Sequence, residues 1–276
     1  MKLPEPYARY LRLLGIEGSP TGLDGLREIV RRHLCRVPFE NVSKLLLFDR
    51  EGAGRLQTLP EFLDGIEHYD LGGTCYSCNP FLAELLRVLG YDADLLGADM
   101  RMIPNLHNCV RVHLDGKEYH VDAGNGAPFL EPMPLDQLPH VFSLGEYRYE
   151  LEARDRVQPR DHQMTVSYAG EFLHSYVVHG PPRTPEFFLP IVLDSFVPAG
   201  KFMSWLRIAR CFEDRVVELR NRTLTWSQGS KSEQRILKNA DELQRAVATD
   251  MAMPRCPVLQ AVKILERLTG RPLFVP

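Results

Sequence analysis

The sequence lacks the features that place a chain in a membrane or on nucleic acid. No stretch approaches the roughly 18 consecutive apolar residues of a membrane span. Neither charge predominates, because 33 basic residues face 36 acidic ones and the net charge is −3. The first residues show no charged region followed by an apolar core, so no targeting segment is expected. We therefore expect a cytoplasmic protein, monomeric or homodimeric, whose partners are small molecules and include neither nucleic acid nor membrane.

Motifs for metals and phosphates are also missing. Gly72-Gly73 is not followed by the Lys-Ser/Thr pair of a phosphate loop. The segment Cys75-Tyr-Ser-Cys78 has no second Cys-x-x-Cys and no His-x-x-x-His partner, so we expect no metal. In a chain without a secretion signal the six cysteines should be reduced thiols, and a reduced thiol is available as a nucleophile. They are Cys35, Cys75, Cys78, Cys109, Cys211 and Cys256.

Hydrophobic spacing divides the 276 residues into three parts. The first ninety residues predict helices, because apolar residues recur at helical spacing over 7–14, 23–34, 62–69 and 82–89. Thr58 with Glu61 forms a possible capping box for the third helix. From about Tyr91 to about Val192 the period shifts toward two, which favours strands of a barrel or sandwich. The last part is mixed, with strands near 216–219 and 223–226 and helices near 240–248 and 257–268.

The segment 107–124 predicts a hairpin whose register can be derived. Asp115-Gly116 is a two-residue turn signal between alternating strands. Counting outward from this turn pairs Arg111 with His120 and would pair Cys109 with Asp122. His107 and Asp122 then share a face as diagonal neighbours, about 7–8 Å apart at the backbone, a gap that the two side chains can close. A bulge in either strand would break this pairing.

Cys75 follows Gly72-Gly73-Thr74 at the start of the predicted fourth helix, where backbone N–H groups and the helix dipole favour an anion. If His107 accepts the thiol proton and Asp122 orients the ring, the three form an activated nucleophile for acyl transfer. The backbone N–H groups of Cys75 or Tyr76 would stabilise a tetrahedral oxyanion. Taken singly, each residue has an ordinary structural role; only their combination predicts catalysis.

Three motifs, in order, resemble those of the arylamine N-acetyltransferase family. Residues 71–79, Leu-Gly-Gly-Thr-Cys-Tyr-Ser-Cys-Asn, match Arg-Gly-Gly-x-Cys-x-x-x-Asn except at the first position. Residues 38–41 spell Pro-Phe-Glu-Asn. His107 is followed by Val-Asp-Ala-Gly-Asn-Gly at 121–126, where the family has Val-Asp-x-Gly-x-Gly.

The resemblance implies an α+β fold with a cysteine-protease-like triad arrangement. Its parts are a helical domain over 1–90 that bears the nucleophile, an antiparallel β-barrel over 91–195 that bears the histidine and aspartate, and an α/β lid over 196–276. It further implies ping-pong transfer, in which acetyl-CoA acetylates Cys75 and an arylamine, hydrazine or similar amine then takes the acetyl group. The implied catalytic residues are Cys75, His107 and Asp122. The implied substrate-binding residues are Phe39, Tyr76, Asn125 and Gly126.

Two departures from the family pattern bear on the site. Leu71 replaces an arginine that pairs with the glutamate of Pro-Phe-Glu-Asn, so Glu40 must be exposed or bonded to other groups. Asn125 stands where members usually carry phenylalanine in the acceptor pocket, so we expect a more polar pocket. Cys78 and Cys109 should lie near the triad.

Other functions fit parts of this pattern. The same fold could serve an amide synthase with a larger thioester donor, a hydrolase if water reaches the thioester, or a diverged ligand binder without catalysis. A different class is a thiol oxidoreductase that uses Cys75 and Cys78, although such proteins place this motif in a βαβ unit, whereas helices precede it here.

Overall fold

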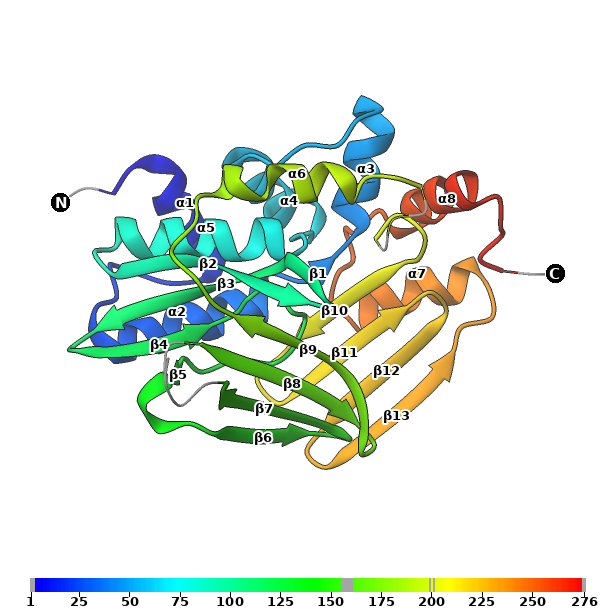
Figure 1. Ribbon diagram of the computed structural model, residues 1–276. Helices are drawn as coiled ribbons and strands as arrows, with labels where there is room; N and C mark the ends of the chain where they lie inside the picture. The colour runs from blue at the N-terminus through cyan, green and yellow to red at the C-terminus, as the bar shows by residue number, and fades with distance from the viewer. Residues whose placement is uncertain (1–2, 155–160, 199, 201, 275–276) are drawn as a thin grey trace.

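The protein is described by a computed structural model that covers residues 3–154, 161–198, 200 and 202–274. In the view of Figure 1 most helices from the first third of the chain lie above two antiparallel sheets, whereas the second helix runs behind the larger sheet. These helices are α1 (Glu5–Leu14), α2 (Gly22–Arg36), α3 (Val42–Glu51), α4 (Leu59–Tyr69) and α5 (Cys75–Val88). None of the helices within the described ranges combines the length and the apolar character needed to cross a membrane.

The larger sheet has eight strands in the order β5-β4-β3-β2-β9-β8-β7-β6. It is antiparallel and curls into a nearly closed barrel, as the family resemblance implied. Its two edge strands are joined where His140 donates from Nε2 to the carbonyl of Pro134, 2.8 Å away. The strands and the short 3₁₀ helix η1 are β2 (Asp92–Met100), β3 (Ile103–Leu114), β4 (Lys117–Val121), β5 (Met133–Pro134), η1 (Leu135–Gln137), β6 (His140–Leu144), β7 (Tyr147–Ala153), β8 (His162–Tyr168) and β9 (Glu171–Val178).

The smaller sheet has five strands in the order β1-β10-β11-β12-β13. Its first strand comes from the N-terminal third of the chain, because Phe39 pairs with Ala209. Buried apolar residues of this sheet pack with α3, α7 and α8 into a second hydrophobic core; they are Ile208, Val217, Leu219 and Leu224. The elements of this part are β1 (Phe39–Glu40), η2 (Pro185–Phe188), α6 (Leu189–Asp194), β10 (Arg207–Cys211), β11 (Arg215–Arg220), β12 (Thr223–Gln228), β13 (Lys231–Ile236), α7 (Ala240–Thr249) and α8 (Val258–Thr269).

The two sheets meet at the tips of their hairpins. Between β6 and β7, the N–H of Gly145 donates to the carbonyl of Gly229, between β12 and β13, at 2.8 Å. Beside it the N–H of Glu146 donates to Ser232 Oγ at 3.0 Å. These contacts fix the sheets on either side of a common cavity.

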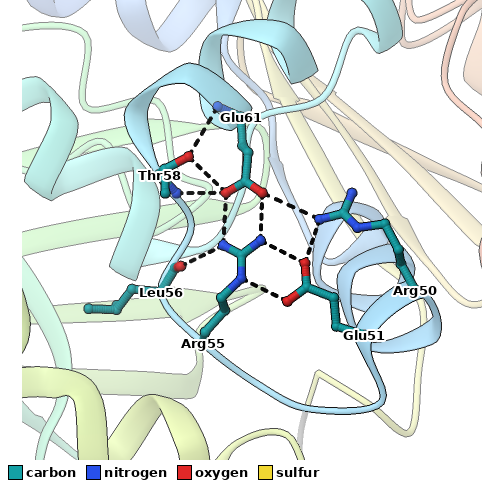
Figure 2. Close-up of polar contacts among 6 residues, drawn as sticks. All are labelled: Arg50, Glu51, Arg55, Leu56, Thr58 and Glu61. Carbon is teal, nitrogen blue, oxygen red and sulfur yellow. Dashed lines mark hydrogen bonds and ion pairs between the residues drawn. The ribbon is translucent and has the colours of Figure 1, made fainter.

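The structure confirms the helices and strands with strong sequence signals. The capping box is present, since the Thr58 hydroxyl accepts from the N–H of Glu61 and the Glu61 carboxylate accepts from the N–H of Thr58 (Figure 2). The expectation of strands as far as Val192 was wrong at its end, because Pro190 lies in the first turn of α6 and proline is favoured there. Helix α3 and strand β13 were not predicted. The division at residues 90 and 195 stays a prediction.

Candidate active site

Cys75 is the first residue of α5, with Thr74 as its N-cap in extended conformation. The approach to this helix is tightly packed: a Cβ on Gly72 would lie 2.2 Å from the carbonyl oxygen of Pro38. The backbone therefore passes where only glycine fits. The side chain of Cys75 is 5% exposed and borders a cavity, so the sulfur lies at the positive end of the helix dipole.

His107 and Asp122 form the hydrogen bond that the hairpin register predicted. The turn Asp115-Gly116 has positive φ at both residues, as a type I′ turn requires, and Arg111 pairs with His120 without a bulge. The ladder ends at Val121, one step before the expected partner of Cys109, because the chain turns toward α5. His107 donates from Nε2 to Asp122 Oδ2 over 2.8 Å.

The bond to Asp122 leaves Nδ1 of His107 for the sulfur, and Cys75 is close enough to the ring to contribute to the pKa of His107. Burial lowers the pKa of His107, but the charge of Asp122, the hydrogen bond to Asp122 and the neighbouring Cys75 outweigh it and raise the pKa to about 10. A protonated imidazole next to a thiol at a helix start is the arrangement of a thiolate–imidazolium pair.

Asp122 is fully buried, and four donors reach its two oxygens. Oδ2 accepts from His107 and from the hydroxyl of Tyr176 at 2.7 Å. Oδ1 accepts from Asn79 Nδ2 at 3.0 Å and from the N–H of Gly124 at 2.8 Å. Burial alone would raise the pKa of Asp122, but the charge of His107 and these bonds lower it. The carboxylate is thus held ionised.

A chain of buried side chains continues behind Asp122. Because the Tyr176 hydroxyl donates to Asp122, its oxygen accepts from His120 Nε2, 3.1 Å away. His120 Nδ1 then accepts from His162 Nε2 at 3.1 Å. Burial first, and then the charge of His162, lower the pKa of His120 to about 3. Every bond in this chain therefore points its proton toward Asp122.

Cys75 and His107 line a cavity of about 500 Å³ between the two sheets. The four residues that the family resemblance implied for substrate binding, Phe39, Tyr76, Asn125 and Gly126, all line it. The wall from the smaller sheet is polar. It carries the ion pair of Arg207 with Glu218, a carboxylate that also accepts from the Tyr147 hydroxyl, and it includes Thr223, Thr225 and Gln234.

Comparison with known proteins places this arrangement in a family. A family model described as N-acetyltransferase matches residues 22–253. The chain belongs to this N-acetyltransferase family. The arylamine N-acetyltransferase of Mycolicibacterium smegmatis is 28% identical over 238 residues, 81% of this chain and 83% of that protein. The pineal gland isozyme of Gallus gallus is 31% identical over 163 residues. That alignment, like those with the mammalian relatives, spans about half of the relative's length.

Solved structures agree on the fold. The arylamine N-acetyltransferase of Nocardia farcinica superposes with a TM-score of 0.77 at 26% identity, covering 96% of this chain and 95% of the other. The Mycobacterium marinum enzyme, solved in complex with CoA, superposes with a TM-score of 0.77 at 20% identity, covering 95% and 98%. Membership of the N-acetyltransferase family confirms the predicted enzyme class.

In this N-acetyltransferase, where Leu71 replaces the arginine of the family pattern, nearby backbone N–H groups bond Glu40 instead. Glu40 is fully buried and accepts from the N–H of Ser43 at 2.8 Å and from that of Gly72 at 3.2 Å. Burial raises the pKa of Glu40, and the backbone donors oppose that rise. Glu40 is therefore bonded to other groups, one of the two outcomes that the sequence left open, and it braces the loop in front of Cys75.

Two side chains that bond Asp122, Asn79 and Tyr176, were not assigned a site role from the sequence. Asn79 lies one helical turn after Cys75; its Oδ1 accepts from the N–H of Ala123, which ties the Asp122 loop to α5. That spacing in a helix was a usable signal. Tyr176, by contrast, lies on a strand with no motif around it. Within the described residues, no cluster of three or more His, Cys, Asp or Glu side chains is arranged to hold a metal ion.

Proposed function

We propose that this enzyme transfers an acetyl group from acetyl-CoA to an arylamine, hydrazine or related amine through a thioester on Cys75. The observation that supports this most directly is that Cys75 lies beside His107, which is hydrogen-bonded to Asp122, at the edge of a cavity. The named activity of the relatives and the three family motifs support the same donor and acceptor.

In the first half-reaction the Cys75 thiolate attacks the carbonyl carbon of the thioester. A carbon–sulfur bond forms to Cys75, the bond to the CoA sulfur breaks, and the imidazolium of His107 protonates the departing thiolate. Backbone N–H groups at the start of α5 face the oxyanion that forms between these two events. The free N–H groups of a helix's first turn suit this task because no carbonyl of the helix accepts from them.

In the second half-reaction the amine attacks the acetyl carbon of the Cys75 thioester. A carbon–nitrogen bond forms, the carbon–sulfur bond breaks, and neutral His107 takes the amine proton, which restores the thiolate–imidazolium pair. Asp122 keeps the ring in place through both steps, because its four donors leave it one orientation. The polar wall with Glu218 and Gln234 favours acceptors that carry hydrogen-bonding groups besides the amine.

The Cys75–Cys78 pair supports no redox function. Both thiols are free, and Cys78 is fully buried with its sulfur toward the carbonyl of Gly73. Burial raises the pKa of Cys78 well above its ordinary value, which opposes thiolate chemistry there. Free thiols also accord with the cytoplasmic location that we propose.

Mass spectrometry after incubation with acetyl-CoA and no amine tests the proposal. We expect one acetyl adduct on the peptide that contains Cys75 and one equivalent of CoA released. Adding an arylamine should remove the adduct. Cys75→Ser should form no thioester, and Cys78→Ser serves as the matched control that should still form it. An unmodified Cys75 peptide with continued amine acetylation would refute the mechanism.

A further inference from the structure

A second cavity of about 640 Å³ adjoins the active-site cavity on the side of the helices. Leucines of α3, with Leu56, Leu71, Val192 and Phe196, give it an apolar lining. Four residues border both cavities: Lys44, Thr74, Tyr76 and Ser195. Two of these, Thr74 and Tyr76, flank Cys75 in the sequence, so the second cavity begins next to the nucleophile.

Most charged groups around the second cavity are already neutralised. Arg55 bonds both Glu51 and Glu61, with distances from 2.5 to 2.8 Å, and Arg50 contacts the same two carboxylates (Figure 2). Asp49 pairs with Arg267, and Asp64 pairs with Arg9. These groups hold the wall together and offer no net charge to a ligand.

Lys44 is different, because no carboxylate of the described residues pairs with it. Its Nζ donates to Ser195 Oγ at 2.5 Å, while the Ser195 hydroxyl itself donates to the carbonyl of Val192. The ammonium also lies 4.3 Å from the centre of the Phe196 ring. Burial lowers the pKa of Lys44 to about 8, and the nearby Cys75 opposes that change. A partly buried cation without a counter-ion is costly unless a ligand supplies one.

We propose that Lys44 binds a carboxylate at the far end of the acyl group, so that the enzyme accepts acyl donors derived from dicarboxylic acids. This rests on the proposed function and extends its donor range beyond acetyl. An acyl chain attached to Cys75 would extend along Tyr76 to the junction, where the ammonium meets its carboxylate. The second cavity gives the chain room.

The position of Lys44 favours a carboxylate on the acyl group over the phosphates of CoA as its ligand. In a CoA thioester the phosphates lie at the opposite end of the pantetheine arm from the sulfur. An anion next to the nucleophile therefore belongs to the acyl group. Lys44 could instead bind a carboxylate on the acceptor amine. The two cases differ in the half-reaction that depends on Lys44: acylation for the acyl group, deacylation for the acceptor.

The test measures the rate of Cys75 acylation in the absence of amine, by rapid chemical quench and mass spectrometry. Succinyl-CoA and glutaryl-CoA are compared with pentanoyl-CoA and hexanoyl-CoA, which match them in length without the charge. We expect the wild-type enzyme to prefer each diacid donor about tenfold, the effect of one charge-assisted hydrogen bond. Lys44→Met should bring the ratio close to one, and Lys44→Arg should keep most of it. Lys263→Met, an exposed lysine on α8, is the matched control.

The outcomes separate this inference from the proposed function. No acetyl adduct on wild-type Cys75 from acetyl-CoA would defeat both. An acetyl adduct without a diacid preference would defeat the inference alone, whatever the folding of the variants. If Lys44→Met still prefers the diacid donors, another group binds their carboxylate and the inference about Lys44 is wrong. If Lys44→Met slows only the deacylation of Cys75 by 4-aminobenzoate, and not that by aniline, Lys44 binds a carboxylate of the acceptor. If Lys44→Met slows acylation equally with every CoA donor, Lys44 binds the phosphates of CoA.

Discussion

At the residue scale, Asp122 shows how one side chain can be fixed by its neighbours. Its two oxygens accept from two side chains and one backbone N–H besides His107. Asp122→Asn would place an amide NH₂ against at least one of these donors and hold His107 in the wrong tautomer. We expect kcat/KM to fall about 10²- to 10⁴-fold in steady-state assays. Asp136→Asn, at the exposed pair with Lys117, is the control; near-normal turnover by Asp122→Asn would contradict the assigned role.

The raised pKa of His107 gives a prediction for stability against pH. Its pKa is about 10 in the folded protein against an ordinary value of 6.5, so the folded state binds the proton more tightly. The stabilisation is complete below pH 6.5 and is lost as the pH rises toward 10. Urea unfolding of the wild type and of His107→Gln should show a difference that shrinks over this range. A constant difference would mean that His107 is neutral in the folded protein.

At the scale of elements, the contact between α5 and the loop after β4 decides the geometry of the site. A Cβ on Gly124 would lie 2.5 Å from the Cα of Cys75 and 2.6 Å from Asn79 Nδ2. Gly124→Ala should therefore push the Asp122 loop off α5 and lower kcat at least about 10²-fold, since small misplacements of reacting groups carry such penalties. Circular dichroism should show the fold retained.

Gly65→Ala on α4 is the matched control for that substitution. The nearest atom to its added Cβ is 3.6 Å away, and alanine is favoured over glycine in a helix by about 1 kcal/mol. Gly65→Ala should leave kcat unchanged and raise the unfolding midpoint slightly. Similar kcat losses in both variants would show that the contact at Gly124 is not the cause.

Elements with local signals could be predicted, and elements that depend on distant partners could not. The hairpin of β3 and β4 follows from Asp115-Gly116, and α4 follows from its capping box, because both signals lie within the element. Strand β13 has mostly exposed side chains and exists only because β12 pairs with it. Helix α3 mixes leucines with charged residues over a short span, and its burial is set by α8.

The same distinction applies to the site. The turn Asp115-Gly116 places His107 beside Asp122, and a helix start marks Cys75, but only the family motifs connected Cys75 to that hairpin. Lys44, Tyr176 and Glu218 reach the site from separate elements through tertiary packing, and no spacing in the sequence connects them to Cys75. The chain behind Asp122 needed coordinates, since His120 and His162 are far apart in the sequence.

At the scale of the whole molecule, buried neutral histidines should make the protein sensitive to acid. Burial lowers the pKa values of His33 and His120 to about 3. Between pH 6.5 and 3 the unfolded chain binds protons that the folded chain does not, so stability falls as the pH falls. Each histidine contributes a slope of about 1.4 kcal/mol per pH unit in this window.

The variant His33→Phe removes one such group far from the triad, next to Phe62. It loses the bond from Tyr10 to His33 Nδ1 and should be less stable at pH 7 by about 1–3 kcal/mol. Its unfolding free energy should nevertheless decline more slowly than that of the wild type between pH 6 and pH 4. Chemical unfolding at several pH values measures both effects, and parallel curves would show that His33 does not titrate on unfolding.

The hydrogen bond from Gly145 to Gly229 joins hairpins that the ribosome completes at different times. The cavity is therefore complete only when the last third of the chain has docked, although Cys75 and His107 are synthesised long before. A chain cut off ahead of β12 would lose part of the cavity wall and, with α7 and α8, much of the second hydrophobic core against which α3 packs. The C-terminal strands thus supply the part of the cavity wall that is synthesised last.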